Sequence, residues 1–143
     1  MNTDKPTSRP TWGRLFGTDA HSDKLLPLNA VKRRAARALG RFDRYVRREL
    51  AKCKVVLPPA LNLVSHQHGE VRLGTDHPQG DAITVWLTGN AKLTKRFKEV
   101  EVLFEIVRAA ENPGVILADN IRFFIGLTSA GPIAYFETHP RSN

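Results

Sequence analysis

The feature that most constrains the fold is the segment of residues 29–54, where apolar and basic side chains alternate with the period of an α-helix. Ten Lys and Arg stand there against two acids, which gives the segment the same net charge, +8, as the whole chain. One broad helix face would collect the apolar side chains Val31, Ala35, Ala38, Leu39, Phe42, Tyr45, Val46, Leu50 and Cys53. The rest of the surface would carry the arginines Arg33, Arg34, Arg37, Arg41, Arg44, Arg47 and Arg48. The pattern predicts a long amphipathic helix with one face in the core.

An asparagine and two prolines predict the two ends of this helix. Asn29 follows Pro27 and is a plausible N-cap, while Pro58 and Pro59 prevent the helix from continuing beyond them. Cys53 is the only cysteine, which excludes an internal disulfide, and its place on the apolar face predicts a buried thiol.

The choice of arginine over lysine on the basic face favours an anionic partner with planar oxygen groups. A guanidinium donates two parallel hydrogen bonds to a phosphate or carboxylate, whereas a lysine acts as a point charge. Outside residues 29–54, the 12 basic and 12 acidic side chains cancel, so the basicity is local. The sequence therefore predicts that the seven arginines contact DNA or RNA phosphates. An acidic protein surface is the alternative partner.

The composition divides the chain into an arm and a domain. Residues 1–27 are rich in Pro, Ser, Thr and Asp and predict a flexible N-terminal arm, and residues 28–143 form one domain. Trp12 and Phe16 lie inside the arm and are expected to dock, either on the domain itself or on a partner. No apolar run approaches the roughly 20 residues of a membrane span, and no secretory signal is visible, so a cytoplasmic protein is expected.

The remainder of the chain predicts a second helix and several strands. The second helix covers residues 91–111, opens at Gly89-Asn90, and carries apolar side chains on more than one side. Strands are expected at residues 70–73, 82–88, 115–118, 121–128 and 133–138, and residues 60–64 form either a helical turn or an edge strand.

These elements predict an α+β domain with two layers. The long basic helix is followed by a β-hairpin of residues 70–73 and 82–88, a second buried helix, and a C-terminal antiparallel hairpin. Phe124 and Phe136 are expected on one sheet face, with Phe123 and Tyr135 on the other. The second helix would then cover one face, and the basic helix or the arm would cover the other.

Three histidines, His66, His68 and His77, lie near Asp76 and Asp81 and raise the question of a metal site. A zinc site needs three or four ligands, and the single cysteine lies elsewhere, so ordinary loop histidines are favoured. The phosphate-binding, dinucleotide-binding, hydrolase and metalloprotease motifs are all missing. The sequence therefore predicts neither a metal nor a cofactor.

Cleavage of RNA by acid–base chemistry is the alternative function, and it needs a base, an acid and cations at the phosphate. The candidate residues are Glu70, Arg72, Arg122, Glu137 and His139. Helices followed by an antiparallel sheet with Glu, Arg and a late His resemble barnase-like and RelE-like small ribonucleases. The segment EIVRAAENPGVILADNIRFFIGLTSAGPIAYFETHP carries this resemblance, although the earlier histidine of that pattern is replaced by Lys95-Arg96-Phe97. The resemblance implies a small metal-independent ribonuclease, of the kind that can act as a toxin.

Overall fold

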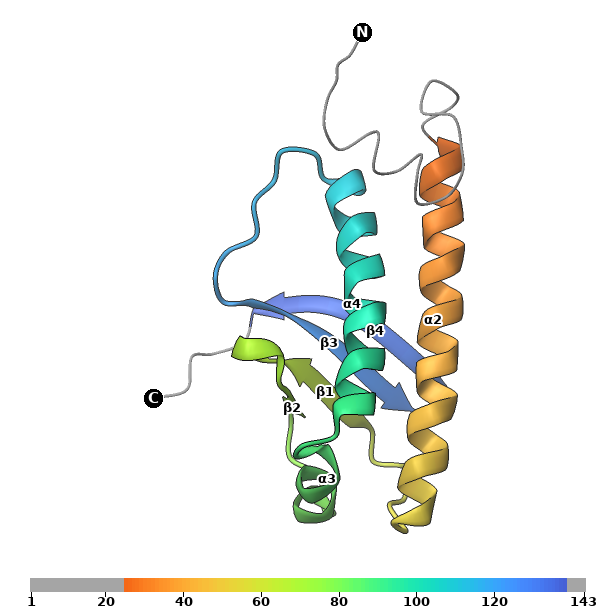
Figure 1. Cartoon of the computed structure of the whole chain (residues 1–143), viewed down its shortest axis with the longest axis vertical. Helices are drawn as coiled ribbons and strands as arrows, with labels where there is room; N and C mark the ends of the chain where they lie inside the picture. Colours follow the sequence, from red (N-terminus) through yellow and green to blue (C-terminus); the bar gives the residue numbers. More distant parts are fainter. Residues whose placement is uncertain (1–24, 139–143) are drawn as a thin grey trace, which may run out of the picture.

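The computed structural model describes residues 25–138, and the side chains from Leu28 onward (Figure 1). The elements are α2 (Leu25–Lys52), β1 (Leu61–Ser65), the short 3-10 helix η1 (Gln67–Gly69), β2 (Val71–Leu73), α3 (Gly80–Leu87), α4 (Ala91–Glu111), β3 (Ile121–Thr128) and β4 (Gly131–Thr138). The predictions for Trp12, Phe16 and His139 lie outside the described residues. Within this range, no helix combines the length and the hydropathy that a membrane crossing requires.

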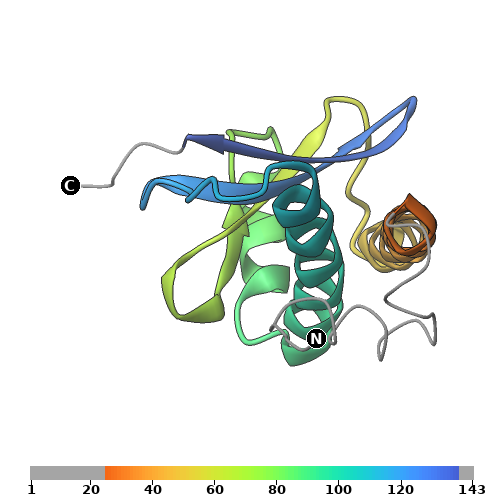
Figure 2. The ribbon, with the colours of Figure 1, turned by 90° about the horizontal axis from the view of Figure 1, so that it is seen from above.

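The domain is an α+β fold with a four-stranded antiparallel sheet in the order β2-β1-β3-β4. Seen from above, α2, α3 and α4 all lie on one side of this sheet (Figure 2). The main core fills the space between them and contains Phe42 from α2, Phe97 from α4 and Phe123 from β3. The basic helix therefore covers the same sheet face as α4. Of the two segments predicted to cover the opposite face, the basic helix is wrong, and the arm lies outside the described residues.

Helix α2 confirms the periodicity seen in the sequence, because Val31, Ala35, Phe42 and Val46 are all buried. It begins at Leu25, so Asn29 lies inside the helix and does not cap it. A proline is tolerated in the first turn of a helix, where no intrahelical bond to its nitrogen is required, so Pro27 did not mark a boundary.

The predicted burial of Cys53 is also wrong, because this thiol is exposed. Helix α2 ends at Lys52, and Lys54 adopts a left-handed backbone conformation (φ 61°). The chain therefore turns away just where the helical pattern would have placed Cys53 in the core.

The strand predicted at residues 82–88 is instead the short helix α3. Ile83 and Leu87, which are four residues apart, are both buried, whereas Val85 is 76% exposed. A strand would have placed all three on one face, and a helix places only Ile83 and Leu87 together. The β-branched residues favour a strand weakly, and packing of the helix against β2 overrides that preference. The hairpin that follows α2 is formed by β1 and β2.

Strand β1 lies inside the sheet, so residues 60–64 form neither a helical turn nor an edge strand. Leu63 is paired with Leu73 of β2 on one side and with Ile125 of β3 on the other. The strand predicted at residues 115–118 is not formed. That segment projects from the domain after α4 (Figure 1), and Ile116 is 91% exposed.

The register of β3 and β4 corrects the predicted sheet faces. Phe123 is opposite Phe136, and Phe124 is opposite Tyr135. Opposed residues of antiparallel strands point to the same face, so Phe124 and Phe136 lie on different faces. Phe123 and Phe136 face the helices, while Phe124 stacks on Tyr135 on the other side, with ring centroids 5.2 Å apart.

Helix α4 covers the predicted residues, Ala91–Glu111, and Asn90 caps it by accepting a hydrogen bond from the Leu93 N–H at 3.1 Å. Because α4 packs beside α2 on the sheet, these two helices define the surface described next.

Candidate functional site

A groove of about 490 Å³ lies between α2 and α4. Its apolar lining consists of Ala38, Phe42, Val100, Val102, Leu103 and Ile106. Its charged lining consists of Arg34, Arg41, Lys95, Arg96, Lys98 and Glu99. Lys98 is paired with Glu101 at 2.8 Å, which offsets part of its charge. The other charged groups still leave the groove strongly positive.

The arginines of α2 are distributed around the helix rather than gathered at one point. Arg33, Arg34, Arg37, Arg41, Arg44 and Arg48 are exposed. Within residues 28–138, none of these six forms an ion pair with an acid. Arg34 and Arg41 line the groove, and the other four extend the positive surface around the helix.

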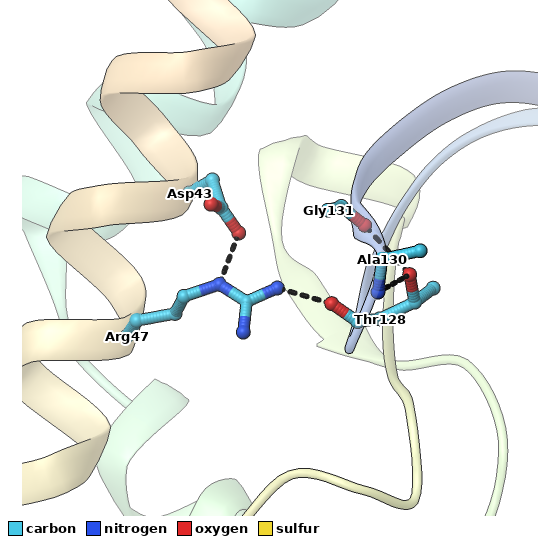
Figure 3. Close-up of polar contacts among 5 residues, drawn as sticks. All are labelled: Asp43, Arg47, Thr128, Ala130 and Gly131. Atoms are coloured by element: carbon cyan, nitrogen blue, oxygen red, sulfur yellow. Dashed lines mark hydrogen bonds and ion pairs between the residues drawn. The ribbon is translucent and has the colours of Figure 1, made fainter.

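Arg47 differs from the other six because it is bound within the domain (Figure 3). Its Nε lies 2.6 Å from Asp43 Oδ1, and its Nη2 donates a hydrogen bond to the carbonyl of Thr128 at the end of β3. The side chains of Arg47 and Asp43 are only 33% and 13% exposed. Arg47 therefore fastens α2 to the β3–β4 turn, with two of its three guanidinium nitrogens bonded within the domain.

We expect Arg47→Ala to destabilise the domain by about 1–3 kcal/mol, because the largely buried Asp43 carboxylate and the Thr128 carbonyl both lose a charged donor. The measurement is the midpoint of urea unfolding. Arg44→Ala is the control, since Arg44 is exposed and is expected to change stability by less than about 0.5 kcal/mol. Equal midpoints for the two variants would show that the Arg47 contacts do not stabilise the fold.

Helix α4 contributes basic residues to this surface that were not among the candidates predicted from the sequence. Residues 91–98 contain Lys92, Lys95, Arg96 and Lys98 and no acid, a local signal that was hidden when charges outside residues 29–54 were summed. Arg96 and Lys92 lie over the ring of Tyr45 of α2, at 4.6 and 5.5 Å from its centroid. These contacts join the positive surfaces of the two helices.

The residues around Tyr45 also affect the pKa of its phenol. Burial raises its pKa and the nearby Glu49 carboxylate adds to the increase, although Arg96, Arg48 and Lys52 act in the opposite direction. Tyr45 therefore remains neutral at physiological pH and serves as an aromatic support for the cations above it.

The candidate acid–base residues lie at two separate places in the structure. Glu70 and Arg72 form an ion pair at 2.7 Å and line a cleft of about 610 Å³. Arg122 and Glu137 are opposite each other on β3 and β4, separated from β2 by β1. Arg122 also donates to the carbonyl of Asp119 at 2.6 Å. His68 lines the cleft beside Glu70 and Arg72, although it was considered only as a metal ligand.

His77 lies away from this cleft and is bound within its own turn. The Nδ1 of the buried His77 accepts a hydrogen bond from the Gln79 N–H at 2.9 Å. In the part of the chain that the structure describes, no three His, Cys, Asp or Glu side chains come together in a way that would hold a metal ion.

Comparison of the chain with protein-family models, with curated proteins and with solved structures finds no match. The chemistry of the groove and the cleft is therefore the ground for a functional proposal.

Proposed function

We propose that the protein binds the phosphate backbone of nucleic acid through the positive surface that α2 and α4 form together. The observation that carries this proposal is the groove between the helices, where Arg34, Arg41, Lys95 and Arg96 converge and Glu99 is the single acid among the described lining residues. Cations held close together repel one another, and a bound polyanion offsets this repulsion.

The chemistry of the groove favours contacts with phosphates over recognition of bases. Guanidinium groups bind phosphates in a bidentate manner, and such contacts supply affinity without information about sequence. Among the described residues that line the groove there is no Asn or Gln, the side chains that read adenine edges. We therefore expect binding that depends strongly on salt and weakly on sequence.

A second candidate function is docking of an acidic protein helix, and the apolar floor of the groove favours it. Val102 is 50% exposed there, and Leu103 and Ile106 lie beside it. An amphipathic helix with acidic flanks would cover the apolar floor and pair with the basic rim. Its binding would depend less on salt than binding to a polyanion, because a folded helix carries no condensed counterions to release.

Salt titration tests the proposed function. If about five phosphates are neutralised on duplex DNA, the slope of log K against log salt concentration is expected near −4 to −5. Arg41→Gln should reduce the magnitude of this slope by about one and weaken all sequences alike. Fluorescence anisotropy with labelled DNA and RNA measures both quantities.

Arg122→Gln is the matched control, because it removes the same charge from β3, outside the groove lining. We expect its slope to equal that of the unchanged protein. No binding to DNA or RNA at ~50 mM salt would refute the proposal. Tight binding of an acidic amphipathic peptide under the same conditions would then favour the second candidate.

A further inference from the structure

The cleft beside the groove brings together the groups that cleavage of RNA requires. It lies between residues 68–72, which include the start of β2, and residues 87–95, which run from the end of α3 into the first turns of α4. His68, Glu70, Arg72 and Lys95 all line it. We infer that this cleft is a catalytic site that cleaves single-stranded RNA by metal-independent transesterification, an inference that rests on the proposed binding of nucleic acid.

Lys95 connects the cleft to the groove, because it lines both. A strand whose phosphates are bound by Arg34 and Arg41 can continue past Lys95 without leaving the positive surface. The N-terminal end of α4 also lines the cleft, through Asn90 and Ala91, and adds a partial positive charge. A phosphate of the bound strand is thereby guided into the cleft.

Glu70 is suited to act as the base. Arg72 donates two hydrogen bonds to it, from Nε at 3.1 Å and from Nη2 at 2.7 Å, and both end on Oε1. No described residue donates a hydrogen bond to Oε2, so this oxygen is available to accept a proton. The two hydrogen bonds from Arg72 fix the orientation of the carboxylate, which a base in a catalytic site requires.

His68 is suited to act as the acid. Its side chain is exposed and lines the same cleft as Glu70, two residues away. A protonated imidazole carries N–H donors that can deliver a proton to a leaving oxygen. Lys95 supplies a cation for the charge that develops on the phosphate.

The reaction balances without a metal or a co-reactant. Glu70 takes the proton of a ribose 2′-OH, and the 2′ oxygen forms a bond to the adjacent phosphorus. The bond between phosphorus and the 5′ oxygen of the next nucleotide breaks, and His68 gives its proton to that oxygen. The products are a 2′,3′-cyclic phosphate and a free 5′-OH. DNA lacks the 2′-OH and is therefore a bound but uncleaved ligand.

The test incubates the full chain with a labelled single-stranded RNA in EDTA, with DNA of the same sequence as the uncleavable ligand. We expect RNA fragments that end in cyclic phosphate, identified by mass spectrometry, and intact DNA. Glu70→Gln should slow cleavage at least ~100-fold, while its DNA affinity changes no more than that of Glu111→Gln. Glu111→Gln is the matched control because Glu111 is also paired with a cation, Lys32 at 2.8 Å, and lines neither the groove nor the cleft.

The outcomes separate the two proposals. RNA that is bound but remains intact would overturn the cleavage site and leave the binding function standing. Equal cleavage by Glu70→Gln and the unchanged protein would overturn the assignment of the base. Absence of binding to both RNA and DNA would refute the proposed function and this inference with it.

Discussion

Replacement of Phe97 by alanine is expected to lower the free energy of unfolding by about 3–5 kcal/mol. The Phe97 side chain has no exposed surface, and its ring contacts Phe42 of α2 and Phe123 of β3, with centroids 5.9 and 5.6 Å apart. Phe97 thus links both helices to the sheet, and its removal would leave a cavity in the middle of the core. Urea unfolding followed by circular dichroism measures the loss.

Val102→Ala is the control for this variant, because Val102 lies on the same helix and is 50% exposed. We expect its effect to be below about 1 kcal/mol. A Phe97→Ala protein that unfolds at the same urea concentration as the unchanged protein would contradict the observed packing of α4 against both α2 and the sheet.

The second large effect is expected when three charges are removed from the groove together, and it is a loss of affinity for nucleic acid. The triple variant Arg34→Gln, Arg41→Gln and Lys95→Gln should weaken binding to nucleic acid by two to three orders of magnitude at ~100 mM salt, because each lost phosphate contact removes roughly one unit of the salt slope. Since all three side chains line the groove and none is paired with an acid in the described part of the chain, folding should be nearly unchanged.

The control for the triple variant removes equal charge elsewhere, through Lys32→Gln, Lys54→Gln and Arg122→Gln, and none of these residues lines the groove. Its affinity should fall by less than about tenfold, through the reduced net charge alone. Equal losses in the two proteins would mean that total charge, and not the groove, governs binding.

The long elements of this fold could be predicted from sequence because their patterns extend over many residues. Helix α4 and strand β3 begin and end at the predicted residues, and α2 buries the predicted apolar face. The short helix α3 could not be predicted, since residues 80–87 are rich in β-branched side chains and only contact with β2 decides their conformation.

The groove could be predicted only in part. The arginines of α2 and the basic residues of α4 are each visible as local clusters, but their convergence depends on which face of the sheet each helix covers. The hydrogen bond from Arg47 to the Thr128 carbonyl could not be predicted, because it depends on the β3–β4 turn reaching α2, which is far away in the sequence. His68 joins Glu70 and Arg72 because the chain folds the β1–β2 connection against the start of α4.

The position of β1 inside the sheet has a consequence for the order of folding. Its pairing with β2 is local, but its pairing with β3 joins Leu63 to Ile125, after two helices have intervened. Closing so long a loop costs entropy that only the finished sheet and core repay. During synthesis, the apolar side chains of α2 and α4 that meet the sheet therefore stay uncovered until β3 has left the ribosome, and chains released before Ile121 are expected to aggregate rather than fold.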